Sequence, residues 1–432
     1  GHLAFARREF GESIEQYRAA AEWAVDGVEA ALDLRSAADA TLAISDAETG
    51  VRLLLDAADR AVADGNVRAT VLALAVIAVN RYPTGTLYDF PPERSRELLQ
   101  NAMDCADTGD LQVSALLATA RAWEHGGRRI GADADLAREA VEAARKTGDP
   151  VLIAGALDAL TVAAGNAGRL RDARACAVER MELVRPLPRH EPYAAAEIID
   201  AFHVAPTTAT AVGDLPAAVA AVDAPDDPVG DHPYISLPRR IRVTALTGRF
   251  EECAQHADAL WERWQRAGTP PIEWMASAMS AAAMVHGLCD DGQFDLWQAR
   301  ALEVAGCTSP DDAPWLTAPY TFAQARVAVH REDVDQARAV VRRAFDGFGE
   351  RWWAPYARTA AAELAVVAGL PDAEDLLEAT AEDAAENDWA AACRKRATAR
   401  HTGNPKDLQA AAEAFARIDA RFEEASTLAL TP

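Results

Sequence analysis

A short motif recurs along this chain, and it restricts the possible folds more than any other feature of the sequence. The motif is a turn residue, usually Gly, followed after two positions by an apolar residue and after three more by a small residue. Copies begin at Arg8, Gly168, Gly213, Gly248, Gly292 and Glu332. Positions 8 and 168 are 160 residues apart and positions 168 and 332 are 164 apart, so four steps in each interval give a period of about 40 residues. A period of this length indicates stacked helical hairpins.

The order of residues in the motif fits two antiparallel helices. The turn residue ends the first helix, the apolar residue enters the second, and the small residue lets the two helices approach closely. We therefore expect an all-α fold, a right-handed superhelical solenoid of about ten antiparallel hairpins over residues 1–432. The hairpins resemble tetratricopeptide repeats (TPRs) with longer helices. A non-repeating helical array is the alternative that the pattern leaves open.

The segments between these turns have helical periodicity and helical stop signals. In residues 133–146, Leu136, Ala140 and Ala144 are among apolar residues that recur every three or four positions. The segment ends at Gly148, and Pro150 can begin the next helix. Similar Gly turns occur near positions 65, 109 and 403, whereas runs of β-branched residues are short. This pattern favours helices of about 12–18 residues joined by short turns.

Three proline clusters interrupt the helical pattern, at 185–193, 224–238 and 309–319. Proline disrupts a helix interior because it lacks a backbone N–H. The repeat resumes in phase after each cluster. We therefore interpret the clusters as long loops between hairpins of one array and not as domain boundaries.

The charge balance excludes one class of partner. The chain has 67 acidic and 43 basic residues, a net charge of -24, whereas nucleic-acid-binding modules are usually basic. No apolar run reaches the length of a membrane span and no signal peptide is visible, which predicts a cytoplasmic protein. The six cysteines are far apart and form no CxxC pair, which favours buried free thiols.

The turns and the C-terminal segment resemble those of a known family. The motif at 168–173, the turn at 146–149 and the apolar spacing of 407–430 are similar to the C-terminal helical repeats of bacterial signal-transduction ATPases. These are LuxR-type transcription regulators of the maltose-activator kind and their adenylate cyclase-linked relatives. The resemblance implies repeats that receive an inducer or a partner protein and contribute to self-association. It also implies an ATPase domain upstream, and since the chain begins with Gly1, we expect a fragment of a longer protein.

Catalytic motifs are weak in this sequence. It contains no phosphate-binding P-loop, no H-E-x-x-H and no G-x-S-x-G pattern. The acids Asp226, Asp227 and Asp231, and the pair Asp311–Asp312, lie in Pro-rich segments, where a solvated loop is a better interpretation than a metal site. We expect no metal, no cofactor and no enzymatic activity.

A concave groove is the expected binding site. In a TPR-like array, first-helix residues about 6, 10 and 13 positions before each turn face this groove. The count predicts ligand-binding side chains at Asp200, His203, Arg242, Met279, His286, Phe322, Arg326 and Tyr356. Arg242, His286 and Arg326 would form a basic ladder for an anionic ligand or an acidic peptide. The alternative is that Arg242 and Arg326 pair with neighbouring acids on a solvated face.

The ten tryptophans allow two interpretations. Trp261 and Trp264 lie on one helix face, and Trp352 and Trp353 precede Tyr356. They either pack in the core between hairpins or line a ligand surface. Together these features predict a non-catalytic sensor or scaffold arm of a signalling ATPase or transcription regulator, with a free-standing peptide-binding adaptor as the alternative. An all-helical enzyme is the least favoured reading.

Overall fold

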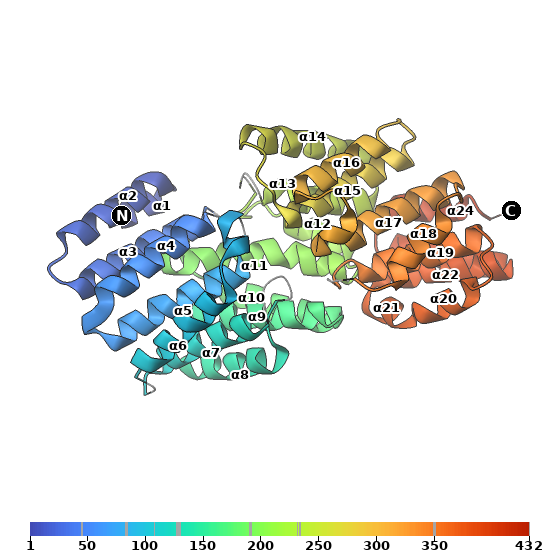
Figure 1. Cartoon of the computed structure of the whole chain (residues 1–432). Helices are drawn as coiled ribbons and strands as arrows, with labels where there is room; N and C mark the ends of the chain where they lie inside the picture. The colour runs from blue at the N-terminus through green and yellow to red at the C-terminus, as the bar shows by residue number, and fades with distance from the viewer. Residues whose placement is uncertain are drawn as a thin grey trace. The chain divides into compact units, whose positions relative to one another are not determined.

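The computed structural model describes residues 1–44, 46–82, 85–107, 109–126, 131–189, 192–230, 232, 235–348 and 351–431. These residues form α-helices and short 3-10 turns, with no β-strand among them (Figure 1). The expected all-α class is confirmed. No helix in this part of the chain is long and apolar enough to cross a membrane.

The chain forms two compact units. Unit 1 contains residues 1–166 and 175–204, and unit 2 contains residues 167–174 and 205–432. The boundary passes through α10 (Leu170–Val184) and α11 (Pro192–Ala211). The repeat pattern alone gave no sign of this division, because the motif continues through it.

Unit 1 is built from successive helical hairpins. Its first helices are α3 (Gly27–Leu42), α5 (Gly65–Arg81), α7 (Leu111–His125) and α9 (Pro150–Asn166). Its second helices are α4 (Ala47–Arg60), α6 (Pro92–Cys105) and α8 (Ala134–Thr147), and α1 (His2–Ala6) and α2 (Phe10–Trp23) precede them. Helices α3, α5 and α7 each pack against their own second helix and against the next first helix.

Unit 2 repeats the same arrangement. Its first helices are α13 (Ser236–Thr247), α15 (Glu273–Leu288), α17 (Pro314–Arg331), α19 (Ala354–Val367) and α22 (Asp388–Thr402). The others are α12 (Leu215–Val222), α14 (Phe250–Arg266), α16 (Phe294–Ala305), α18 (Ala337–Phe345), α20 (Ala373–Ala379), α21 (Ala381–Glu386), α23 (Pro405–Arg417) and α24 (Arg421–Leu428). Its first helices begin at positions 236, 273, 314, 354 and 388, which are 34 to 41 residues apart and bracket the expected period.

The backbone explains why the motif begins with a turn residue. All six motif starts have a positive φ, between 53° at Glu332 and 79° at Gly168, Gly248 and Gly292. This left-handed conformation ends a helix, and Gly adopts it without a steric penalty. Five of the six second helices then begin at the apolar residue of the motif, and α18 begins at Ala337 instead.

The small residue of the motif lies where two helices meet. Ala173, Ala218 and Cys253 are completely buried. A larger side chain there would separate the two helices, which is why small residues recur at this position. The degenerate copy at Gly292 carries Trp297 in its place, and this side chain is also buried.

All three proline clusters are less irregular than expected. Helix α17 begins at Pro314 and continues through Pro319, so much of 309–319 is helical. Residues 236–238 belong to α13, and 192–193 begin α11. The physical reason is that a helix tolerates proline in its first turn, where N–H groups have no partner within the helix. Positions 190, 191, 231, 233 and 234 lie outside the described residues.

The interior contains many small residues, above all alanine. The expected core role of the aromatic residues is confirmed for Trp264 and Trp297, which are 1% exposed. All six cysteines are free, but only Cys253 and Cys393 are buried, and Cys289 is exposed. The expectation of buried thiols was therefore too general.

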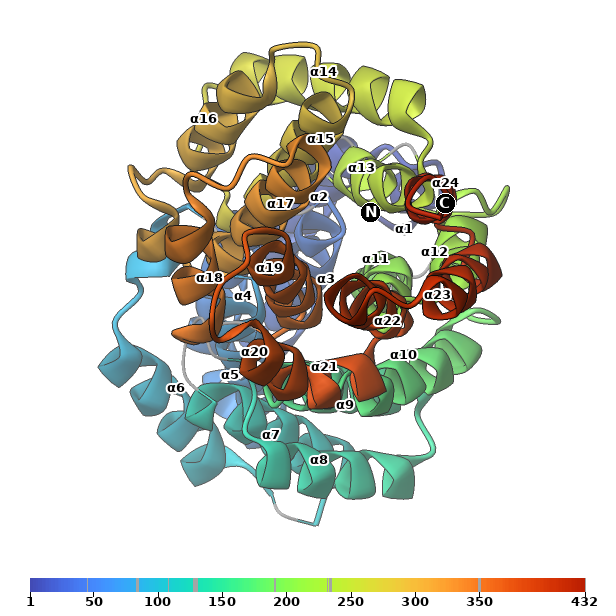
Figure 2. The ribbon, with the colours of Figure 1, turned by 90° about the vertical axis from the view of Figure 1, so that its right-hand side faces the viewer.

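The last helices of unit 2 pack against its earlier hairpins. The Asn387 side chain donates from Nδ2 to the Ala211 carbonyl oxygen at 2.7 Å, and the Asp388 N–H donates to the Val212 carbonyl at 2.9 Å. One hairpin further on, the ring of Phe422 lies 5.1 Å from that of Phe250. In Figure 2, which looks along these helices, α22 and α24 lie nearer the viewer than α11 and α13, so the start of each later helix meets the end of the earlier one. These contacts thus join segments of unit 2 that are about 175 residues apart in the sequence.

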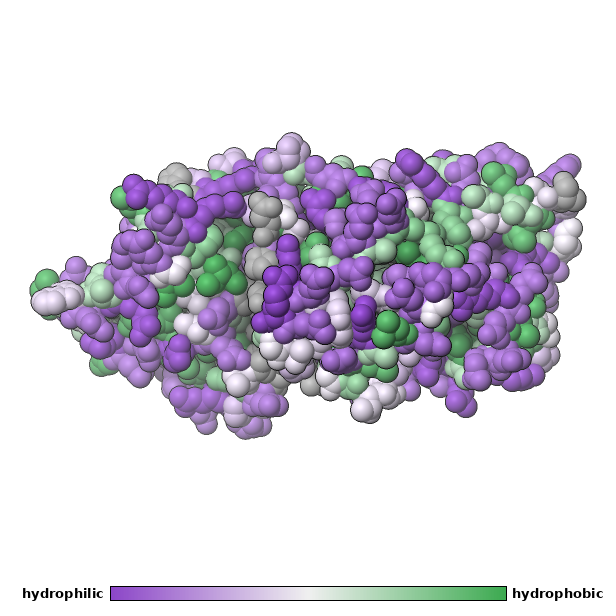
Figure 3. All heavy atoms as spheres, turned by 90° about the horizontal axis from the view of Figure 1, so that it is seen from above, coloured by the Kyte–Doolittle hydropathy of each residue, from purple (hydrophilic) through white to green (hydrophobic). Residues whose placement is uncertain are grey.

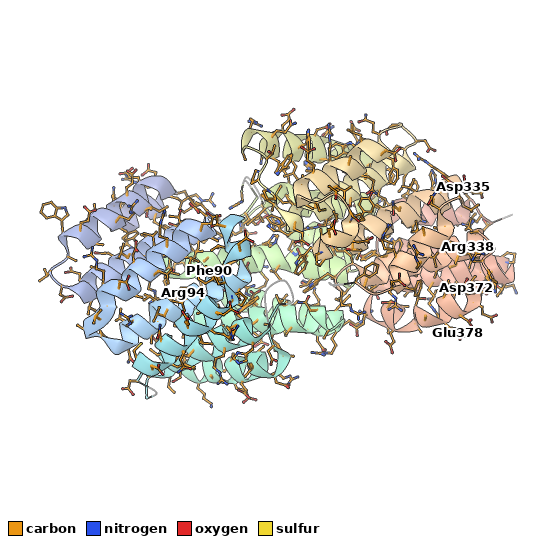
Figure 4. The ribbon with its side chains drawn as sticks, viewed as in Figure 1. Phe90, Arg94, Asp335, Arg338, Asp372 and Glu378 are labelled. Atoms are coloured by element: carbon orange, nitrogen blue, oxygen red, sulfur yellow. The ribbon has the colours of Figure 1, made fainter. Side chains whose placement is uncertain are left out.

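The second helices carry the solvated surface. In unit 2, α18 and α20 project exposed charged side chains away from the first helices, among them Arg338, Asp372 and Glu378 (Figure 4). Hydrophilic residues also predominate on the face shown in Figure 3. The acidic excess of the sequence therefore contributes to solubility.

Candidate ligand-binding site

Three residues that were expected to face a groove lie in the packed interior of unit 2. Met279, Phe322 and Tyr356 are 0, 3 and 0% exposed. The ring of Phe322 lies 5.2 Å from those of Tyr356 and Trp389. This corrects the expectation that the three side chains are accessible to a ligand. The frame counted back from the turns did not anticipate that Trp389, in the first helix of the following hairpin, packs against Phe322 and Tyr356.

Arg326 was expected to offer a free cation, and the structure gives it carboxylate partners. Its Nε and Nη2 donate to both carboxylate oxygens of Glu423 at 2.9 and 2.8 Å. Arg396 binds the same Glu423 at 2.6 Å and donates to Glu363 at 2.8 Å. Burial opposes ionisation of Glu363, but Arg396 and Arg326 outweigh it and lower its pKa to about 2. We call Arg326, Glu363, Arg396 and Glu423 the unit 2 network.

The other two members of the basic ladder differ from each other. His286 shares a hydrogen bond of 2.5 Å between its Nδ1 and Asp291 Oδ2, and its ring stacks on Trp297. Arg242 donates from Nη1 to the Ser277 hydroxyl at 3.1 Å. Burial, and then repulsion from a neighbouring arginine, lower the pKa of Arg242 to about 10. The ladder is therefore not a row of free cations. Arg326 pairs with acids, but in the buried interior and not on a solvated face, and Arg242 has a hydroxyl partner instead of an acid.

Asp200 and His203 lie on α11, in the part of it that belongs to unit 1. Asp200 is a member of a buried unit 1 network that consists of Arg81, Asp158, Arg180, Glu197 and Asp200. Its Oδ2 accepts from Arg81 at 2.8 Å and from Arg180 at 2.7 Å. Although burial opposes it, the two guanidinium groups hold the pKa of Asp200 well below its usual range, and His203 adds to this effect. The Asp200 carboxylate therefore already has two guanidinium partners inside the protein.

A cavity of about 520 Å³ lies in unit 1, and none of the predicted site residues lines it. Its polar lining includes Arg35, Asp39, Asn66, Asp110, Asp149 and Tyr193. Its apolar lining includes Leu32, Val67, Val71, Val113, Leu116 and Leu152. These residues come from the first helices α3, α5, α7 and α9 and from the start of α11. The volume lies within the range of small-molecule sites.

Two of the lining carboxylates have structural roles. Asp110 caps α7 by accepting hydrogen bonds from the N–H groups of Gln112 and Val113. Asp149 accepts at 2.8 Å from the N–H of Val151, and its other oxygen accepts from the Tyr193 hydroxyl at 2.5 Å. Their negative charges face helix N-termini, which carry partial positive charge. These two carboxylates are largely satisfied within the protein.

Arg35 and Asp39 are less well satisfied. They lie one helical turn apart on α3, and Arg35 Nε is 3.9 Å from Asp39 Oδ2, beyond hydrogen-bonding distance. The Asp39 side chain is only 15% exposed, and burial raises its pKa to about 6 in spite of Arg35. The Arg35 guanidinium lies 5.5 Å from the centre of the Tyr193 ring. The cavity thus holds a loosely paired cation and anion.

The sequence contains a signal for these residues that was not used. Counting back 6, 10 and 13 positions from residue 45, between α3 and α4, gives Asp39, Arg35 and Leu32, all of which line the cavity. The count was applied only from position 213 onward, because the first half has fewer clear copies of the motif. The same count from Gly168 gives Val162, Asp158 and Gly155, none of which lines the cavity, so the rule does not extend to α9.

Two acidic residues of the Pro-rich loops pair with arginines. No group of three potential ligands close enough to hold a metal ion occurs among the described residues. Asp227 pairs with Arg239, and Asp311 lies 3.1 Å from Arg343. Asp231 lies outside the described residues.

Comparison with known proteins identifies no family. No protein-family model matches the chain, and no curated protein matches it. One solved structure that aligns is described as a circular tandem repeat protein with novel repeat topology and enhanced subunit contact surfaces. The alignment covers 99% of this chain and 97% of that chain, at 14% identity and a TM-score of 0.16. A TM-score this low supports no conclusion about a shared fold or function.

Proposed function

We propose that this chain is a non-catalytic sensor or scaffold module that binds a ligand on the concave side of its first helices. The observation that carries the proposal is the unit 1 cavity, which is lined by first helices from successive hairpins and contains the loosely paired Arg35 and Asp39. Binding on the concave side is what stacked helical hairpins provide, because their first helices form a continuous surface.

The proposal includes the architecture and the cellular role that the sequence suggested. The array is a right-handed superhelical solenoid of about ten TPR-like hairpins, in keeping with the helix spacing of both units. In a bacterial signalling ATPase or transcription regulator, such an arm receives an inducer or a protein partner in the cytoplasm and assists self-association. The free-standing adaptor would use the same concave surface, and no contact in the structure favours it.

The test is a ligand screen by thermal shift and native mass spectrometry on the full chain. The library contains amino acids, organic amines and acids, sugars, nucleotides and short peptides. Each hit is repeated on Thr70→Trp, which places a bulky ring in the cavity that Thr70 lines. We expect at least one compound to raise the melting temperature of the wild-type chain and to have no effect on Thr70→Trp.

A matched control separates loss of the cavity from loss of folding. Arg52→Trp places the same ring on the exposed side of α4, where Arg52 does not line the cavity. Ligand binding by this variant should equal that of the wild type. Compounds that bind Thr70→Trp with the same affinity as the wild-type chain would show that the cavity is not the binding site.

A further inference from the structure

The unit 1 cavity contains two charged groups whose bonding capacity is mostly unused. Among the residues that the structure describes, neither terminal nitrogen of Arg35 donates a hydrogen bond, and neither oxygen of Asp39 accepts one. The Arg35 fork is held in place by the Tyr193 ring beneath it. A guanidinium fork matches a carboxylate, and a buried carboxylate attracts an ammonium group.

We propose that the cavity binds a free α-amino acid with an apolar side chain. The ligand carboxylate pairs with the Arg35 fork, and the ligand ammonium group pairs with Asp39. This inference rests on the proposed function, since it names the ligand class for the same concave site.

The spacing of the two protein charges favours a ligand that carries both charges close together. The ammonium nitrogen and the carboxylate carbon of an α-amino acid are both bonded to one carbon, so they are about 2.5 Å apart. Arg35 and Asp39 are also neighbours, with 3.9 Å between their closest charged atoms. A simple amine would leave the Arg35 fork unused. A simple acid would bring a second negative charge next to Asp39.

The other charged lining residues do not compete for the ammonium group. Asp110 and Asp149 use their oxygens to cap helices and, in the case of Asp149, to accept from Tyr193. Their charges are partly offset by the helix N-termini that they cap. Asp39 is therefore the lining carboxylate that gains most from an incoming cation.

The remainder of the cavity is apolar. Val67 and Val71 from α5, Leu116 from α7 and Leu152 from α9 contribute its wall. A volume of about 520 Å³ leaves room for a large side chain beyond the charged head group. Leucine and phenylalanine are accordingly the first probes.

The experiment measures the affinity of the full-length chain by isothermal titration calorimetry. Leucine and phenylalanine are compared with isopentylamine and phenethylamine, which lack the carboxylate, and with 4-methylpentanoate and 3-phenylpropanoate, which lack the amine. We expect each amino acid to bind at least tenfold more tightly than its amine and its acid. The variants Asp39→Asn and Arg35→Gln should each weaken amino-acid binding at least tenfold.

The controls are substitutions of the same kind outside the cavity. Asp33→Asn lies on α3 and Arg52→Gln on α4, and neither residue lines the cavity. Both should bind amino acids as the wild type does, and circular dichroism should show that all four variants are folded.

The possible outcomes distinguish this inference from the broader proposal. Equal affinity for phenethylamine and phenylalanine would overturn the zwitterion inference and indicate a cation site. If no amino acid binds, but another compound from the screen binds the wild-type chain and not Thr70→Trp, the inference fails and the proposed function stands. If nothing binds the wild-type chain, both fail.

Discussion

At the scale of single residues, Asp39 shows a conflict between folding and binding. Burial raises its pKa from 3.8 to about 6 in the folded chain. Between pH 4 and pH 6 the folded state therefore holds a proton that the unfolded state has lost, so this group makes the free energy of unfolding fall as pH rises. A cation bound next to Asp39 would offset this loss of stability at neutral pH.

This conflict gives a prediction for Asp39→Asn without ligand. The variant should match the wild type at pH 4 and be more stable by up to about 3 kcal/mol at pH 7, because two pKa units correspond to roughly that energy. Hydrogen exchange of the α3 amides at both pH values measures the difference. An advantage of the same size at both pH values would contradict the raised pKa.

Glu332 gives a second prediction at this scale. It adopts a φ of 53° at the end of α17, where most copies of the motif have Gly. A side chain in this region costs about 1–2 kcal/mol, so Glu332→Gly should stabilise unit 2 by about 0.5–1 kcal/mol, after the greater flexibility of Gly in the unfolded chain is subtracted. Melting temperature is the measurement. Glu332→Ala is the control, and an equal gain with Ala would contradict the backbone explanation.

At the scale of elements, the unit 2 network fixes α24 to the earlier helices. Glu423 lies on α24, and it binds Arg326 on α17 and Arg396 on α22. Removing one partner from a buried ion network leaves an uncompensated charge, which typically costs 3–5 kcal/mol. Helix α24 is therefore sensitive to the loss of a single charge.

We expect Glu423→Gln to loosen α24. Hydrogen exchange in α24 and in the facing part of α17 should become at least tenfold faster. The adjacent Glu424, which is partly exposed on the same helix, provides the control, and Glu424→Gln should leave exchange unchanged. Protection equal to the wild type in Glu423→Gln would show that apolar packing alone holds the helix.

The elements were largely predictable, and the site was not. The turn motif located five second helices at their first residue, because a left-handed turn and a buried small residue are local requirements that sequence records directly. The burial of Phe322 and Tyr356 depends on Trp389 in α22, the first helix of the next hairpin. Tyr356 also donates to the carbonyl of Thr210, which lies 146 residues earlier in the chain. No periodicity within a hairpin encodes such a contact. The cavity was missed for a simpler reason, since the groove count was not applied to α3.

At the scale of the whole molecule, the net charge of -24 acts against compactness. Salt screens repulsion between exposed charges, whereas the buried networks are screened much less. Raising sodium chloride from about 20 to about 300 mM, which shortens the screening length from roughly 20 to 6 Å, should therefore raise the melting temperature. A falling melting temperature would mean that exposed ion pairs contribute more to stability than the acidic excess subtracts.

The return of α22 and α24 onto earlier hairpins also has a mechanical consequence. An open array of hairpins can stretch and recoil like a spring, because each hairpin touches only its neighbours. In unit 2 the contacts of Asn387 with Ala211 and of Glu423 with Arg326 join segments that are far apart along the coil. Extension of this unit must break a buried ion network before the pitch can change. Unit 2 should therefore resist a pulling force with a distinct yield point rather than with the gradual elasticity of an open coil.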